Sequence, residues 1–159
     1  MKKPIALLLM SLAPALALAA GDHQGGHAMH GDPQASAVGQ AGKAADVTRT
    51  VEVSMDDSMR FVPDKVTVKA GETVRFFLKN VGKVPHEMVI GSMAELKEHA
   101  EMMRKFPTME HEEPNMITLK PRQRGGLIWK FDQPGSVDFA CLVPGHMEAG
   151  MIGKVTVSK

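Results

Sequence analysis

The chain contains a single cysteine, Cys141, and a histidine and a methionine follow it at equal five-residue steps, His146 and Met151. Cysteine and methionine are also common packing residues, so a structural role is the simplest alternative. A copper ion that alternates between Cu(I) and Cu(II) needs ligands that suit both states. A thiolate, two imidazoles and a weak axial thioether meet that need. The three residues therefore indicate three of the four ligands of such a site.

Residues 1–19 have the three parts of a secretory signal peptide. Lys2 and Lys3 give the positive start, residues 5–18 form an apolar stretch, and a small-x-small sequence ends at Ala19. This pattern predicts cleavage near Ala19 and export, and the two-lysine start favours a bacterial periplasm. An exported chain with one cysteine forms no internal disulfide, so its thiol is free, paired between chains or bound to a metal. Because a metal ligand is protected from oxidation, the compartment favours the metal hypothesis.

The charge balance of the chain argues against two classes of partner. The formal net charge is +1, and loss of Lys2 and Lys3 with the signal peptide changes it to −1. A nearly neutral protein has no electrostatic attraction for nucleic acid or for an anionic membrane surface. No stretch after the signal peptide is long and apolar enough to cross a bilayer. We therefore expect a soluble monomer that binds neither nucleic acid nor membrane.

From Val47 onward, apolar and polar residues alternate as they do in half-buried strands. Short runs of this kind recur between Pro and Gly turn signals, and about eight of them are typical of a β-sandwich or barrel. After a first run at 47–54, they lie at 65–69, 73–79, 86–90, 116–120, 126–132, 135–141 and 152–158. The sequence therefore predicts an all-β domain over residues 47–159.

One segment of this domain has a helical period instead. Ser92 and Glu95 have the spacing of a capping box and Pro107 ends the segment, which predicts a helix over 92–106. The apolar residues expected to face the core recur at helical steps: Leu96, Ala100, Met103 and Phe106. Loop-like residues follow and extend the insertion to about residue 116.

The fourth ligand of a trigonal copper site should come from a different strand end. Apart from His146, His86 is the histidine within the strand series, and it heads the run His-Glu-Met-Val-Ile. This run, followed further along the chain by Cys-x4-His-x4-Met, resembles the type 1 copper site of the cupredoxins. The loop is similar to those of auracyanin and azurin, and the resemblance extends from Val47 to Lys159. It implies a Greek-key β-sandwich with one type 1 copper ion held by His86, Cys141, His146 and Met151.

Departures from related patterns refine this resemblance. Many electron-carrying cupredoxins have Asn after the first histidine ligand, whereas Glu87 stands here. That change leaves open the hydrogen bonding of the ligand loop, the colour and the reduction potential. A single cysteine argues against a binuclear copper centre, and Ala140 and Leu142 replace the flanking histidines of multicopper oxidases. We therefore expect that the protein is not an enzyme. Oxidation of Cu(I) to Cu(II) stays open as an alternative activity.

Two segments outside the central site are rich in soft metal donors. Residues 20–46 lack an apolar period and predict a flexible arm, and the insertion at about 92–116 combines histidines with methionines. Thioethers favour Cu(I), and imidazoles accept both oxidation states. We expect additional copper, of lower affinity, at His23, His27, Met29, His30, His99, Met102, Met109 and His111.

These extra donors separate two functions that the central site serves equally well. A soluble one-electron carrier of the azurin, plastocyanin or auracyanin kind does not need them. Copper-tolerance cupredoxins combine a cupredoxin domain with Met- and His-rich extensions, and the chain resembles them. The favoured interpretation is therefore periplasmic copper handling, with copper ions and a periplasmic copper-delivery or redox protein as partners. One-electron transfer is the alternative.

Overall fold

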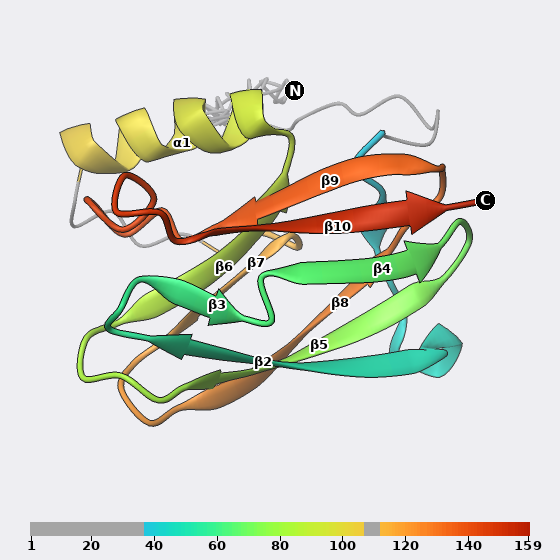
Figure 1. Cartoon of the computed structure of the whole chain (residues 1–159), viewed down its shortest axis with the longest axis horizontal. Coiled ribbons are helices and arrows are strands. Elements are labelled where there is room, and N and C mark those ends of the chain that lie inside the picture. The colour runs from blue at the N-terminus through green and yellow to red at the C-terminus, as the bar shows by residue number, and fades with distance from the viewer. Residues whose placement is uncertain (1–36, 107–111) are drawn as a thin grey trace, which may run out of the picture. The chain divides into compact units, whose positions relative to one another are not determined.

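Two five-stranded sheets face each other in the computed structural model of the chain, which describes residues 37–106 and 112–159 (Figure 1). The first sheet has the order β1 (Gln40–Ala41), β8 (Arg124–Lys130), β5 (Thr73–Asn80), β2 (Arg49–Asp56), β3 (Arg60–Val62). The second has the order β4 (Lys65–Lys69), β10 (Ile152–Ser158), β9 (Gly135–Ala140), β6 (His86–Gly91), β7 (Met116–Leu119). Strand β2 is parallel to β5 and β4 is parallel to β10, while the other neighbouring pairs are antiparallel. The all-β fold with two sheets is confirmed.

Alternating side chains build the core between the sheets. In β4, Val66 and Val68 are buried while the residues on either side of them are exposed. Phe61 of β3 and Phe139 of β9 come from different sheets and meet edge to face, with ring centroids 5.0 Å apart. Such aromatic pairs add about 0.5–1.5 kcal/mol beyond the burial of their surface. This contact helps to fix the two sheets against each other.

The helical insertion forms α1 (Met93–Lys105), with the capping box that the sequence predicts. The Ser92 hydroxyl accepts the Glu95 N–H, and the Glu95 carboxylate accepts the Ser92 N–H. Leu96, Ala100 and Met103 are buried, and α1 lies against β6 and β9. The expectation for Phe106 is wrong, because its side chain is 57% exposed. Phe106 is the C-cap, with φ −131° and ψ 65°, so the helical period no longer directs its side chain.

Secondary structure is present on the N-terminal side of the predicted domain boundary at Val47. Strand β1 pairs with β8, and a short 3-10 helix, η1 (Ala44–Asp46), follows it. The Trp129 indole N–H donates to the Val38 carbonyl over 2.7 Å. A two-residue strand is too short to show a period, so the sequence pattern could not reveal it. Residues 1–36, which include the predicted signal peptide and most of the predicted arm, lie outside the described residues.

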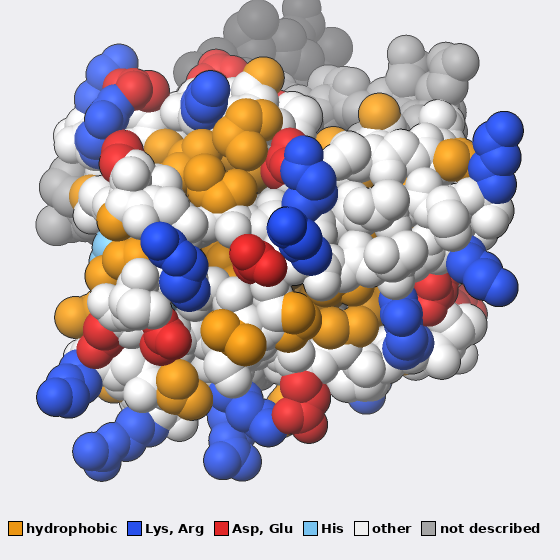
Figure 2. All heavy atoms as spheres, in the orientation of Figure 1, with side chains coloured by type: hydrophobic (Ala, Val, Ile, Leu, Met, Phe, Trp, Pro, Cys, Tyr) orange, Lys and Arg blue, Asp and Glu red, His pale blue; other side chains and the backbone are white. Residues whose placement is uncertain are grey.

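One face of the molecule shows a mixture of charges that is consistent with the nearly neutral charge balance of the sequence (Figure 2). On the face drawn in Figure 2, basic and acidic side chains are interspersed rather than gathered into a block of one sign. Within the described ranges, the structure contains no helix long and apolar enough to cross a membrane.

Candidate metal centre

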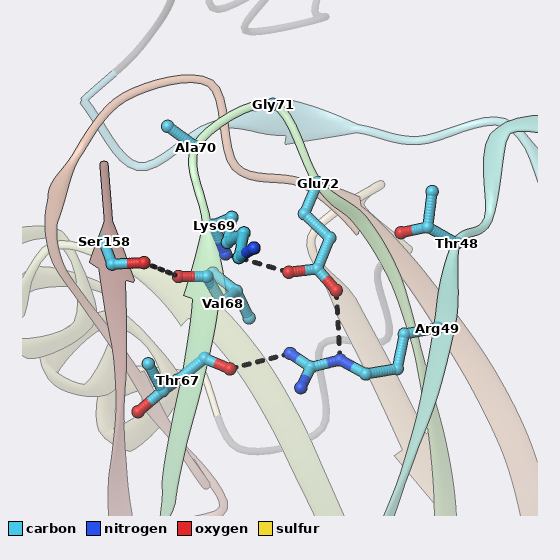
Figure 3. A pocket seen from close by; sticks show the side chains of 9 residues that line it. All are labelled: Thr48, Arg49, Thr67, Val68, Lys69, Ala70, Gly71, Glu72 and Ser158. Atoms are coloured by element: carbon cyan, nitrogen blue, oxygen red, sulfur yellow. Dashed lines mark hydrogen bonds and ion pairs between the residues drawn. The ribbon is translucent and has the colours of Figure 1, made fainter.

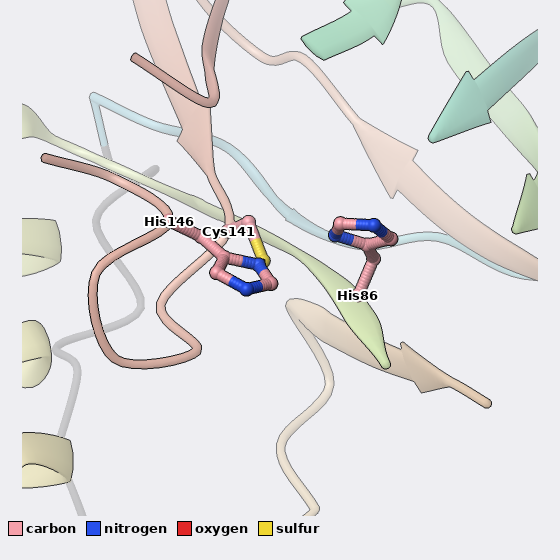
Figure 4. A group of neighbouring side chains, drawn as sticks. All are labelled: His86, Cys141 and His146. Carbon is pink, nitrogen blue, oxygen red and sulfur yellow. The ribbon is translucent and has the colours of Figure 1, made fainter. Parts of the chain in front are cut away.

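Two neighbouring strands bring His86 and Cys141 to the same end of the second sheet. His86 is the first residue of β6 and Cys141 directly follows β9, and these strands are antiparallel with Val89 opposite Ala140. His146 comes from the loop between β9 and β10. The donor atoms of the three side chains all lie within 4.8 Å of one another. Figure 4 shows the three side chains converging from the two strand ends and the loop.

Backbone hydrogen bonds close the loop between Cys141 and Met151. The Cys141 N–H donates to the Met151 carbonyl over 3.1 Å, and the Met151 N–H donates to the His146 carbonyl over 3.0 Å. Met151 is fully buried and belongs to the same core cluster as Cys141. The equal steps in the sequence therefore bring the backbones of all three residues together.

Burial governs the chemistry of the Cys141 thiol. Its sulfur lies 3.2 Å from Nδ1 of His146 and accepts the Glu87 N–H over 3.4 Å. Loss of solvation raises the pKa of Cys141 to about 12, although the N–H groups of Glu87 and Val143 oppose the shift. A thiol that stays protonated at neutral pH is a poor nucleophile, whereas a metal ion displaces its proton on binding. The environment therefore suits a metal ligand better than a nucleophile.

The two imidazoles offer lone pairs to the same space. Burial, followed by the neighbouring His86, lowers the pKa of His146, so this ring is neutral at neutral pH, as a metal ligand requires. His86 is fully buried, and its Nδ1 has no hydrogen-bond partner among the described residues. A buried polar atom without a partner is costly, and an ion that accepts the Nδ1 lone pair would remove that penalty. The donor set fits a copper ion.

Asp57, which the sequence pattern does not identify, contacts the other nitrogen of His86. Its Oδ1 lies 3.2 Å from Nε2 of the ring. The backbone N–H of Lys83 also donates to this carboxylate, and that contact, ahead of the one with His86, holds the pKa of Asp57 below its ordinary value. An acidic residue in an exposed turn gives no sequence signal for this role, because the contact arises only from tertiary structure.

Known proteins match this chain in sequence. Residues 47–158 match the sequence profile of the copper binding proteins, plastocyanin/azurin family. The chain belongs to this cupredoxin family. Copper is the cofactor that goes with that membership and with the thiol and imidazole donors of the site.

Two relatives of this cupredoxin share most of its length. The copper-resistant cuproprotein CopI of Rubrivivax gelatinosus is 47% identical over 135 residues, which cover 85% of this chain and 80% of the relative. The copper-resistant cuproprotein CopI of Pseudomonas aeruginosa is 34% identical over 175 aligned residues, covering 92% of this chain and 96% of the relative. The structure of auracyanin B has a TM-score of 0.62 at 24% identity and covers 76% of this chain and 96% of its own. Auracyanin B therefore supports the fold.

Glu87 takes a direct part in holding the ligand loop of this cupredoxin. The side chain is buried, and its Oε1 accepts the Leu142 N–H over 2.9 Å. Oε2 accepts the hydroxyl of Thr118, which lies opposite Glu87 on β7, over 3.1 Å. Glu87 thus contacts two consecutive residues at the start of the loop: its N–H donates to the Cys141 sulfur, and its carboxylate accepts the Leu142 N–H. Glu87, which stands where many electron-carrying cupredoxins have Asn, therefore ties β6 to the loop.

The accessory donors predicted from the sequence lie elsewhere. His99 and Met102 are on α1, where His99 is half-buried and Met102 is 46% exposed. Within residues 37–106 and 112–159, the central group is the one cluster of at least three His, Cys, Asp or Glu donor atoms. The remaining accessory residues lie outside the described ranges: His23, His27, Met29, His30, Met109 and His111.

A shallow pocket of about 570 Å³ at the other end of the sheets does not belong to the metal centre (Figure 3). Two of its charged side chains are already engaged: Arg49 Nε lies 3.0 Å from a Glu72 carboxylate oxygen, and Arg49 Nη2 donates to the Thr67 carbonyl. Strand β5 begins beside this pocket at Thr73 and ends at Asn80, whose side chain donates to the Val84 carbonyl near His86. The length of the strand separates the two places.

Proposed function

We propose that this cupredoxin binds one type 1 copper ion through four ligands and serves in periplasmic copper handling and tolerance. The proposed ligands are His86, Cys141, His146 and Met151. The observation that carries the proposal is the convergence of a buried thiol and two imidazoles within 4.8 Å. One of those imidazoles has a buried nitrogen without a hydrogen-bond partner among the described residues. Met151, buried beside Cys141, adds a weak thioether donor.

The surrounding residues keep these ligands in place. Copper, when bound, supplies a one-electron couple. The loop hydrogen bonds, the Glu87 carboxylate and the Asp57 carboxylate act on the ligand-bearing backbone or on a ligand ring. Because these contacts hold the proposed ligands in one arrangement, little reordering should be needed when copper binds or changes its oxidation state.

Copper handling is favoured over electron transfer by features outside the centre. The matching relatives from Rubrivivax gelatinosus and Pseudomonas aeruginosa are named copper-resistant cuproproteins. The Met- and His-rich segments supply further soft donors for copper of lower affinity. The signal-peptide pattern at residues 1–19 supports a periplasmic location. We infer a monomer without enzymatic activity that exchanges copper with a periplasmic partner protein.

One observation is also consistent with the alternative of a one-electron carrier. His146 is only half-buried, and its neighbours Pro144 and Gly145 are exposed. A ligand ring that reaches the surface gives an electron a short route to a docked redox partner. The same opening also admits copper from a delivery protein, so the opening alone does not choose between the two functions.

A replacement experiment in cells tests the choice. Cells whose only copy carries Cys141→Ser should become sensitive to added copper while respiring normally when copper is scarce. A strain carrying Glu52→Gln, a change at an exposed residue of β2, serves as the control and should match the wild type. Normal copper tolerance with a respiratory defect would instead support the electron carrier.

A further inference from the structure

The carboxylate of Asp57 contacts the backbone that leads into His86. Asp57 lies in the turn between β2 and β3. Its Oδ2 accepts the Lys83 N–H over 2.8 Å, and its Oδ1 lies 3.4 Å from the Val84 nitrogen. A Cβ on Gly82 would collide with Oδ1, so a glycine is needed for this close approach. Three consecutive residues, Gly82, Lys83 and Val84, therefore shape the backbone that the Asp57 carboxylate contacts.

The same carboxylate decides which nitrogen of His86 carries the proton. A neutral imidazole has one N–H and one lone pair, and an ionised carboxylate only accepts hydrogen bonds. With Asp57 Oδ1 3.2 Å from Nε2, the proton belongs on Nε2. Nδ1 then holds the lone pair, and it is Nδ1 that is buried without a partner among the described residues.

We propose that Asp57 is a positioning residue of the copper centre that selects the Nε2–H form of His86 and favours Cu(II) over Cu(I). The inference rests on the proposed copper site. A carboxylate behind a ligating imidazole fixes the orientation of the ring and makes it a stronger donor. Its negative charge also stabilises the doubly charged ion more than the singly charged one. The protein therefore holds copper as Cu(II) more firmly than it would with a neutral group at residue 57.

The first test uses the copper-free protein and compares the wild type with Asp57→Ala. Nitrogen chemical shifts of the His86 ring, measured by NMR, report which nitrogen is protonated. The expected result is a proton on Nε2 in the wild type and a mixture of the two forms in Asp57→Ala. A wild-type ring protonated on Nδ1 would overturn the proposal, and so would an Asp57→Ala ring that keeps the wild-type form.

The second test measures the affinities of the protein for Cu(II) and Cu(I) by competition with chelators. Asp57→Asn keeps the size of the side chain and an acceptor oxygen but removes the charge. The ratio of Cu(II) to Cu(I) affinity should fall about tenfold, which corresponds to a rise of about 59 mV in the reduction potential of a one-electron couple. Asp56→Asn is the matched control, because Asp56 bonds to the Ser58 N–H in the same turn. An Asp57→Asn ratio equal to that of Asp56→Asn would overturn the proposal.

The proposed copper site and the proposed role of Asp57 can fail separately. If Cys141→Ser loses the visible absorption of the copper protein while Asp57→Asn leaves the affinity ratio unchanged, the copper site stands and the role of Asp57 does not. If Cys141→Ser keeps the absorption, the ligand assignment itself fails.

Discussion

The two regions that carry soft metal donors differ in how their side chains are held. At the end of the sheets that carries the proposed copper ligands (the ligand end), His86, Cys141 and Met151 are fully buried. Backbone hydrogen bonds fix the loop that joins Cys141 to Met151. On α1, Met102 is 46% exposed and His99 is half-buried, while Leu96 and its buried neighbours on the inner face attach the helix to the sheet.

This difference predicts a difference in affinity. At the ligand end, the entropy of ordering the donors is lost when the protein folds, so copper meets a prepared site. An exposed long side chain such as that of Met102 loses its rotamer freedom only when the ion binds, and that loss weakens binding. The number of soft donors in a segment therefore predicts copper capacity, whereas burial and hydrogen bonding predict affinity.

Removing the thiolate should have the largest effect. Cys141→Ser should abolish the intense visible absorption of the copper-loaded protein, because the transition from thiolate to copper requires sulfur. Met102→Leu, the control on α1, should keep the full absorption. Spectra recorded at matched copper content provide the comparison, and an intensely coloured Cys141→Ser protein would contradict the assignment.

Raising the pH should strengthen binding at the central site. Burial raises the pKa of Cys141 to about 12, so the thiol is protonated in the neutral range and loses its proton when copper binds. While the pH stays below that value, copper affinity should therefore increase about tenfold for each unit by which the pH is raised. The pKa of His146 is lowered, so this ring is already neutral and releases no second proton.

Chelator competition at two neutral pH values one unit apart measures this dependence. Cys141→Ser should lose it, because a serine hydroxyl and a thioether have no proton to give up at these pH values. Equal pH dependence in the wild type and in Cys141→Ser would show that the thiol is not the group that exchanges a proton for copper.

Loss of the Glu87 tie should destabilise the copper-free protein by a moderate amount. Glu87→Ala leaves the buried Leu142 N–H without its acceptor, which costs about 1–3 kcal/mol. The control, Glu52→Ala, removes an exposed ion pair with Lys79, and such pairs contribute about 0–1 kcal/mol. Urea unfolding gives both free energies, and equal losses would mean that Glu87 does not hold the loop.

Changes on α1 should have the smallest effect. Replacing His99 by Ala together with Met102 by Leu should lower the total copper bound, measured by metal analysis, without reducing the visible absorption of the central site. Deleting residues 20–36, which include His23, His27, Met29 and His30 and leave β1 in place, should lower it further. Unchanged copper content would remove the accessory sites from the account, and a bleached centre would contradict the separation of the two regions.

The residues that we propose as copper ligands could be selected from the sequence because they stand in distinctive contexts. Cys141 is the single cysteine, and His86 heads a strand whose apolar residues are easily recognised. Helix α1 was equally predictable, since the capping box of Ser92 and Glu95 is a local signal and forms as expected.

Features that depend on contacts between distant segments could not be predicted. Strand β3 has three residues, and its pairing with β2 leaves no periodic trace. Asp57 acquires its role because the turn after β2 approaches the segment before β6. Glu87 differs from the residue usual in electron-carrying cupredoxins, and only its bond to the Leu142 N–H reveals that the loop is still held.

The most direct test of the central claim is a crystal structure of the copper-loaded mature protein with anomalous scattering recorded at the copper absorption edge. We expect the strongest copper peak to lie between Nδ1 of His86, Sγ of Cys141 and Nδ1 of His146, with the sulfur of Met151 facing it. Weaker peaks near Met102 or His99 would be consistent with accessory copper. A strongest peak on α1, with none among His86, Cys141 and His146, would contradict the account.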